Sequence, residues 1–174
     1  MQITSSRLRS FRVFGLNCPM EELCARNVIL KQTLSAGNLF MRRTKKSKSL
    51  SSLKKKAWSL FSLLVRKSAA DRRGIVICYT CGAIIPWQVS QASHAIGGRH
   101  NAVLFDEDLV RVCCVRCNIY LRGNYPVFIL KLINEHSADW FEKKLAGSHQ
   151  IVKWTTSDMR ERIKCYELRL KRLD

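Results

Sequence analysis

The sequence predicts an α+β protein. Its small strand-containing core is held together by a zinc site and has flanking helices and a basic N-terminal arm. Two CxxC motifs, each preceded by a short β-branched or apolar run, predict the core. Apolar residues at helical spacing before and after this region predict the helices. A chain of 174 residues, 47% of them hydrophobic, is large enough for one domain with an ordinary core.

The two CxxC motifs are the most specific signal in the sequence. Cys78 and Cys81 form the first motif and Cys114 and Cys117 the second, with 32 residues between Cys81 and Cys114. Two residues between thiolates let a tight turn direct both sulfurs at one ion, and two such turns complete a closed, structural site. We therefore expect these four cysteines to bind a structural Zn²⁺. The alternatives are a redox-active dithiol or simply buried thiols.

Positive charge is concentrated before the cysteines. The chain has 31 Lys and Arg against 13 Asp and Glu, a net charge of +18, and residues 1–77 hold 17 of the basic residues but only 3 acidic ones. Such an excess is typical of a protein that binds a polyanion, either nucleic acid or an anionic membrane surface. The densest part, the basic run from Arg42 to Lys56, is either a phosphate-binding arm or a solvated linker. Its predicted DNA contacts are Lys45, Lys46, Lys48, Lys54, Lys55 and Lys56.

Membrane insertion and secretion are not expected. The longest apolar candidate, AWSLFSLLV, is interrupted by serines and is far shorter than the roughly 18 residues of a membrane span. The first residues contain arginines but no continuous apolar segment of the kind that a secretory signal needs. Paired CxxC motifs without such a signal fit a reducing compartment.

Local patterns predict the elements around the cysteines. Strands are expected at 75–77, 83–89 and 109–113, and helices at 17–37, 50–70, 126–136, 137–147 and 157–173. The last three helices are expected to be capped by Asn124, by Ser137 and by either Thr155 or Thr156. Met159, Ile163, Tyr166 and Leu170 share one face of the last helix. The predicted organisation is a basic extension with one helix (1–48), an amphipathic helix (49–74), the zinc-bound core (75–136) and a helical tail (137–174).

Further motifs lie between and beyond the CxxC pairs. In chain order they are CYTCG, Ala92-Ser93-His94, Phe105-Asp106-Glu107, CVRCN, Gly123-Asn124 and Lys153-Trp154-Thr155. Together they resemble the NinG (Rap) recombination endonuclease family of lambdoid phages, whose core looks like a zinc-bracketed HNH nuclease. The resemblance covers about residues 50–174. It implies a ββα-metal (HNH-like) core and a cytoplasmic protein, in the host cell if a phage encodes it.

The resemblance also implies roles for individual residues. His94 matches the family's histidine, which in an HNH hairpin is the general base that deprotonates water for in-line attack on a phosphodiester. Asn118 stands where HNH proteins bind the catalytic Mg²⁺ or Mn²⁺, with Asp106 and Asp108 as further candidate ligands. The alternatives are a structural histidine and an asparagine that caps a helix. Further DNA contacts are expected from Arg99, His100 and Arg122.

Three positions depart from the family's pattern. Gln91 stands where the family has Asp, Ser93 where it has Gly, and Leu109 where it has the Asn that orients the catalytic imidazole. Asp108, one position earlier, is a candidate replacement for that Asn if the strand carries a bulge. Loss of an acidic ligand and of the orienting Asn would slow catalysis without changing the fold.

The expected function is metal-dependent endonucleolytic cleavage of branched DNA recombination intermediates, including Holliday junctions and D-loops. Two symmetric cuts favour a homodimer, and phage or host recombination proteins are expected partners. The departures at Gln91 and Leu109 suit an alternative, a catalytically weak or inactive zinc-binding DNA-recognition module. A third alternative, a basic scaffold for RNA or a phage replication partner, rests only on the charge of residues 1–56.

Overall fold

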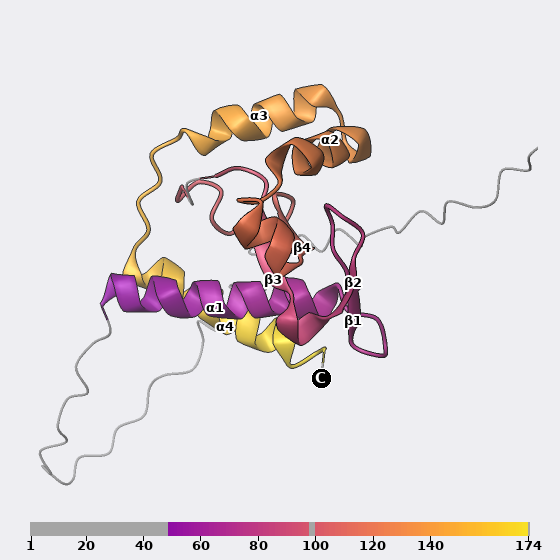
Figure 1. Ribbon diagram of the computed structural model, residues 1–174. Helices are drawn as coiled ribbons and strands as arrows, with labels where there is room; N and C mark the ends of the chain where they lie inside the picture. Colours follow the sequence, from indigo (N-terminus) through magenta and orange to yellow (C-terminus); the bar gives the residue numbers. More distant parts are fainter. Residues whose placement is uncertain (1–48, 98–99, 174) are drawn as a thin grey trace, which may run out of the picture. The chain divides into compact units, whose positions relative to one another are not determined.

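The computed structural model describes residues 49–97 and 100–173, which belong to one compact unit. The predictions for residues 1–48 and for Arg99 lie outside the described residues. The described part has mixed α+β structure, with two small antiparallel sheets and flanking helices (Figure 1). Its elements are α1 (Leu50–Ser68), β1 (Ile75–Ile77), β2 (Ile84–Pro86), η1 (Trp87–Val89), β3 (Gln91–His94), β4 (Val110–Cys113), η2 (Arg116–Tyr120), α2 (Tyr125–Glu135), α3 (Ala138–Ser148) and α4 (Thr156–Leu170).

Helix α1 confirms the predicted amphipathic helix. Ser49 caps it, because its side chain accepts a hydrogen bond from the backbone N–H of Ser52. The apolar residues at three- and four-residue spacing are the ones that α1 buries: Leu53, Ala57, Phe61 and Leu64. The helix therefore presents one apolar face to the rest of the unit.

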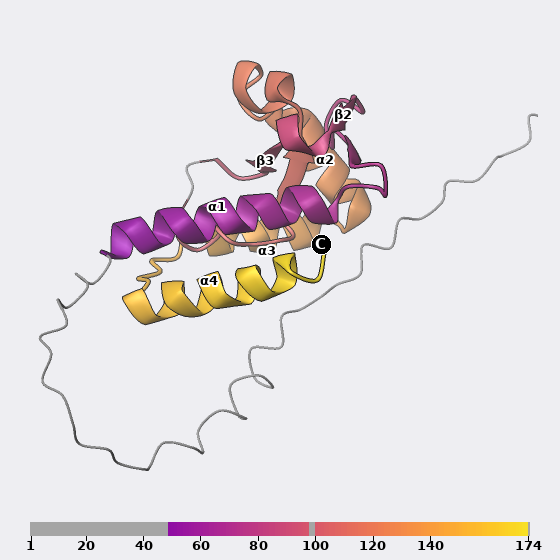
Figure 2. The same ribbon diagram turned by 90° about the horizontal axis from the view of Figure 1, so that it is seen from below.

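Helix α4 lies along α1 (Figure 2). Thr155 and Asp158 form a capping box at its start, which satisfies two backbone N–H groups at the helix N-terminus. The four residues predicted to share a face are all buried against α1: Met159, Ile163, Tyr166 and Leu170. With the buried face of α1 and with Leu104, Phe105 and Val110, they form the first hydrophobic cluster, called here the helical cluster.

The strands form two separate antiparallel hairpins. β1 pairs with β2, and β3 pairs with β4 with Gln91 opposite Cys113 and His94 opposite Val110. The predicted strands at 75–77 and 109–113 are confirmed, the second starting one residue later. The predicted strand at 83–89 is wrong in length: it ends at Pro86 and is followed by the single 3₁₀ turn η1. Proline has no backbone N–H to donate to a neighbouring strand, which explains this end.

Strand β3 was not predicted from local pattern. Its residues, QASH, contain no β-branched or large apolar side chain, so propensity gives no strand signal. Pairing with β4 supplies the missing stabilisation, since β4 is rich in valine and three of its four residues are buried. Long-range pairing therefore overrides local preference here.

The β3–β4 hairpin separates the helical cluster from a second cluster. Consecutive side chains of a strand point to opposite faces. Accordingly Val110 belongs to the helical cluster, whereas Leu109 and Cys113 belong to the second cluster. That cluster, called here the zinc-side cluster, consists of Cys78, Ala95, Ile96, Val103, Leu109, Cys113, Cys117, Phe128, Leu132 and Phe141.

Helices α2 and α3 cover the zinc-side cluster. Ser137 caps α3 through a hydrogen bond from the Trp140 backbone, as predicted, and the helix ends one residue beyond Gly147. Asn124 precedes α2 as predicted, but it has left-handed backbone geometry and makes no side-chain capping bond. Among the helices of 49–97 and 100–173, none combines the length and apolar character needed to cross a membrane.

Candidate metal centre and functional pocket

The four predicted cysteine ligands converge on one point. The sulfur atoms of Cys78, Cys81, Cys114 and Cys117 all lie within 4.8 Å of one another, and those of Cys81 and Cys114 are 3.8 Å apart. Tetrahedral Zn²⁺ with bonds of about 2.3 Å places its sulfur ligands roughly 3.8 Å apart. The cluster is therefore close enough to bind a metal ion such as zinc.

Hydrogen bonds lower the pKa of one of these thiols and raise that of another. The backbone N–H of Cys114 donates to the sulfur of Cys78 at 3.2 Å. Burial opposes ionisation of Cys78, but hydrogen bonds from the Cys81, Thr80 and Cys114 segments lower its pKa to about 6. A backbone hydrogen bond from Ala83 favours ionisation of Cys81, yet burial and hydrogen bonds with the other three thiols raise its pKa to about 12. Four thiolates can coexist here only around a cation, so the donor set fits Zn²⁺.

The second CxxC motif leads directly into a helical turn. Cys114 follows β4, and Cys117 lies inside η2, a wide turn closed by a hydrogen bond from the Leu121 N–H to the Arg116 carbonyl. This i to i+5 pattern defines a π-helical turn, a form found frequently at functional sites. β3, β4 and η2 thus make a strand–strand–helix unit, and the cysteine cluster joins its end to the β1–β2 hairpin.

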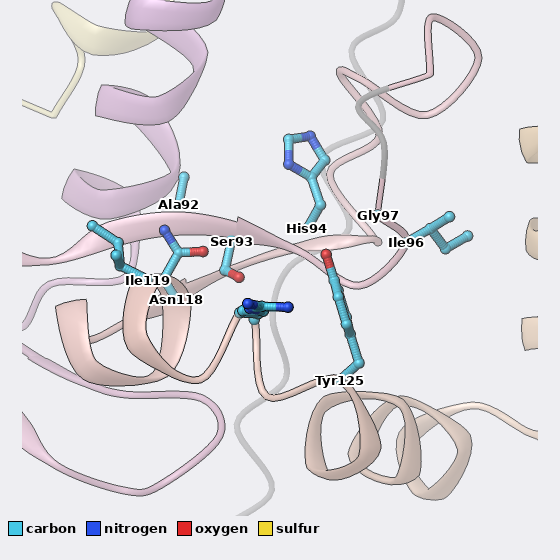
Figure 3. A pocket seen from close by; sticks show the side chains of 10 residues that line it. Ala92, Ser93, His94, Ile96, Gly97, Asn118, Ile119 and Tyr125 are labelled. Carbon is cyan, nitrogen blue, oxygen red and sulfur yellow. The ribbon is translucent and has the colours of Figure 1, made fainter.

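A pocket of about 400 Å³ lies between β3, η2 and the start of α2 (Figure 3). It is lined by Ala92, Ser93, His94, Ile96, Gly97, Asn118, Ile119, Arg122, Gly123 and Tyr125. Three of the predicted site residues therefore border one cavity: His94, Asn118 and Arg122.

His94 is the last residue of β3 and is held on two sides. Its ring stacks on Trp58 of α1 with centroids 4.8 Å apart and planes 19° apart. Its Nε2 lies 3.2 Å from the carbonyl oxygen of Leu104. His94 and Ser93 leave the strand on opposite sides (Figure 3), so the His94 ring lies against Trp58 of α1, on the face of β3 opposite to Ser93 and Gln91.

Asn118 is the third residue of η2. Val115 occupies the N-cap position, so the alternative that Asn118 caps the helix is wrong. The Asn118 side-chain amide instead donates to the side-chain carbonyl of Gln91. Gln91 and Ser93 share a face of β3 because strand side chains alternate. Gln91, noted from sequence only as a departure, is therefore a direct partner of Asn118.

Residues 31–174 match the family described as NinG, Bacteriophage Lambda NinG protein. The chain belongs to the NinG family. The match begins at residue 31, upstream of residue 50, where the sequence motifs alone start the resemblance. Among curated proteins and among solved structures, none matches the chain.

The acidic segment of this NinG-family chain does not reach the pocket. Asp106 and Asp108 both bind the ammonium group of Lys144 on α3, at 2.8 and 2.9 Å. Glu107, between them, pairs with Arg169 on α4. The segment thereby fastens its loop to two helices. Neither Asp106 nor Asp108 lines the pocket, so this geometry does not support the prediction that they bind a catalytic ion.

The pocket does not by itself fit a divalent cation. Its described lining contains no carboxylate, and the oxygen donors beside Asn118 are neutral, the Ser93 hydroxyl and the Gln91 amide. Protein sites for Mg²⁺ usually supply at least one carboxylate. A catalytic Mg²⁺ or Mn²⁺ therefore stays a prediction that rests on the NinG resemblance.

Several of the predicted DNA contacts have partners within the protein. Lys54 donates to the side chain of Asn101, and Lys56 pairs with Glu167 at 2.6 Å. Lys55 is exposed, as is His100, whose ring centroid lies 6.4 Å from that of His149. Lys45, Lys46 and Lys48 lie outside the described residues.

Tyr125 is a pocket residue that sequence reasoning missed. Its ring lies against two glycines, since a Cβ atom at Gly97 or at Gly123 would come within 3.0 Å of it. Gly123 also has φ of +94°, which side chains rarely adopt. The only local hint of this contact was that Gly123 lies two residues before Tyr125. Only the fold brings Gly97 to the same ring.

Proposed function

We propose that this NinG-family protein is an endonuclease that hydrolyses phosphodiesters in branched DNA recombination intermediates, including Holliday junctions and D-loops. One observation supports the proposal: His94, Asn118 and Arg122 all line one pocket beside a strand–strand–helix unit that is bracketed by four clustered cysteines. Family membership supports the same reading.

His94 is the proposed general base. The Leu104 carbonyl accepts a hydrogen bond only if Nε2 carries the proton, so in the neutral imidazole the lone pair is on Nδ1. Stacking on Trp58 fixes the plane of the imidazole. A ring held in this way can take a proton from water without first reorienting.

Arg122 is the proposed phosphate contact. It is exposed, borders the pocket and has left-handed backbone geometry, with φ of 50°. A guanidinium group can bind two phosphate oxygens at once, which would hold the backbone of the substrate beside His94.

The four cysteines would hold a structural Zn²⁺ that fixes the β1–β2 hairpin to the start of η2. Zinc in this role binds no substrate; it holds the protein segments that border the pocket. A catalytic Mg²⁺ or Mn²⁺ stays a prediction from the family resemblance, because the described pocket lining offers no carboxylate to hold it.

Incubation of the zinc-loaded protein with a labelled four-way junction tests the proposal. We expect nicked products with Mg²⁺ or Mn²⁺ and none from a linear duplex of the same arm sequence. Paired incisions related by two-fold symmetry would support the homodimer that junction cleavage favours. Tight junction binding without cleavage by any divalent ion would overturn the nuclease proposal.

That last outcome would favour a second candidate, a zinc-binding module that recognises DNA without cutting it. Two observations favour it. The side chain of Asn118, the proposed metal ligand, is hydrogen-bonded to Gln91, and the carboxylates of Asp106 and Asp108 form ion pairs with Lys144. Both leave the described pocket lining without an acidic group.

A further inference from the structure

Three consecutive large side chains leave η2 and its C-cap toward solvent. Ile119 is 54% exposed, Tyr120 78% and Leu121 46%. A single exposed apolar side chain is ordinary, but several gathered at one place mark an interaction surface. These three residues are called here the ridge.

The chain on both sides of the ridge is anchored by buried residues. Cys117, two residues before Ile119, is fully buried in the cysteine cluster, and its carbonyl accepts a hydrogen bond from the Gly123 N–H at 2.9 Å. Phe128 of α2, on the other side, is also fully buried. The intervening chain has three successive residues with positive φ: Arg122, Gly123 and Asn124. Backbone strain of this kind persists only where the surroundings enforce it, and it gathers at functional sites.

The ridge adjoins the pocket and lies in a positively charged segment. Ile119 lines the pocket, as does Arg122, which follows the ridge in sequence. Arg116 and Arg122, one on each side of the ridge, are both exposed. Residues 109–134 contain no Asp or Glu. An apolar surface between two cations complements a nucleotide, which joins an apolar base to an anionic phosphate.

We infer that the ridge is a nucleobase-stacking site in which the Tyr120 ring stacks on a base whose face is exposed at the branch point of the DNA. The inference rests on the proposed function and deepens it, because it states what distinguishes a branch from a duplex. Bases in a closed duplex are stacked on one another, so only DNA with unpaired or splayed bases can offer a free face to Tyr120. Arg116 and Arg122 would hold the phosphates on either side.

Binding of fluorescent DNA tests this inference without cleavage. The probes are a four-way junction and a duplex with a short unpaired bulge, each with 2-aminopurine at the unpaired or branch-point base, and a fully paired duplex. Binding is measured with no divalent ion added. Native protein is expected to quench 2-aminopurine, and Tyr120→Ala is expected to abolish the quench and weaken junction and bulge binding about 10-fold, with duplex binding unchanged.

Two further variants make the result specific. Tyr120→Phe keeps the ring and should bind and quench as the native protein does. Ile151→Ala removes another apolar side chain, 89% exposed and far from the ridge in sequence, and should change nothing. Circular dichroism and zinc content confirm that each variant is folded.

The outcomes separate this inference from the proposed nuclease activity. Equal binding of junction by native protein and Tyr120→Ala would overturn the stacking site even if the native protein cleaves junctions. A Tyr120-dependent quench without any cleavage would uphold the stacking site and contradict the nuclease. If Tyr120→Ala instead converts a dimer to a monomer in sedimentation without loss of quenching, the ridge is a contact between copies and the inference is wrong. Failure of native protein to bind any of the DNAs would overturn both.

Discussion

The helical cluster and the zinc-side cluster are held together by different interactions. The helical cluster buries a continuous apolar face of α1 against α4, and aromatic contacts such as Phe61 to Tyr166, 5.4 Å between ring centroids, fill it. The zinc-side cluster includes three cysteines, and the β1–β2 hairpin that it anchors exposes Ile77 and Ile84. The first rests on ordinary hydrophobic burial, whereas the second adjoins four clustered cysteines that are close enough to bind a metal such as zinc.

The pocket lies where the two clusters meet. His94 is stacked on Trp58, which packs against the helical cluster, and Asn118 follows Cys117, which belongs to the zinc-side cluster. Because a different cluster holds each of these side chains, the proposed base and the proposed metal ligand are positioned independently. Perturbing one cluster should therefore disturb one of them more than the other.

Loss of zinc should have the largest effect. Cys117→Ser removes a fully buried ligand, so we expect it to lose zinc and to unfold the zinc-side cluster. Structural zinc contributes on the order of 10–16 kcal/mol in small zinc-dependent peptides. Metal analysis should find about one zinc per native chain, and Cys165→Ser, a cysteine of α4 outside the cluster, should retain it. A Cys117→Ser protein without zinc but with native thermal stability would contradict the dependence.

Removal of a large side chain from the helical cluster should lower the free energy of unfolding without loss of zinc. Phe61→Ala opens a cavity at a fully buried position and should lower the free energy of unfolding by about 3–5 kcal/mol. Denaturant unfolding followed by circular dichroism measures this loss. Zinc content should remain about one per chain, since no ligand belongs to the helical cluster. Coupled loss of zinc would show that the two clusters form one cooperative structure.

Charge outside both clusters should affect DNA binding alone. Lys54 and Lys56 are engaged with Asn101 and Glu167, whereas Lys55 is exposed. Lys55→Ala should make the logarithmic salt dependence of duplex binding shallower by about 0.9, the value for one phosphate contact. Alanine at all six lysines of the basic run should reduce the slope further. An unchanged slope in the six-fold variant would identify the run as a passive linker.

The smallest effect should be a pH dependence confined to α4. Hydrogen bonds from the backbone and side chain of Thr155 hold the pKa of Asp158 below its ordinary value. A carboxyl group with a lowered pKa in the folded state stabilises the protein above its unfolded pKa of about 4, and that contribution is lost as the pH falls through the folded pKa. The Asp158→Asn variant should thus have a lower free energy of unfolding than the native protein at pH 6, and the difference should shrink as the pH falls toward 3. Asp139→Asn, in the first turn of α3, is the control.

The sequence predicted the parts of the fold that local chemistry determines. The buried face of α4, the caps Ser137 and Thr155, and the meeting of the four cysteines all follow from spacing and residue type. Strand β3 did not, because its stability comes from pairing with β4 across a long loop.

The pocket was predictable only in part, for the same reason. His94 and Asn118 stood out because they match motifs of the NinG family. Nothing local indicated that Lys144 would bind Asp106 and Asp108, or that Gln91 would meet Asn118. Those contacts join residues 27 to 38 positions apart and appear only once the chain is folded.

The rate of junction cleavage by His94→Ala tests the central claim most directly. Single-turnover cleavage of a four-way junction should fall by roughly 10²–10⁴-fold relative to native protein, the contribution of a positioned general base. Junction affinity and zinc content should stay close to native, because His94 belongs to neither the cysteine cluster nor the ridge. Cleavage by His94→Ala at the native rate would contradict the assignment of this pocket as the active site.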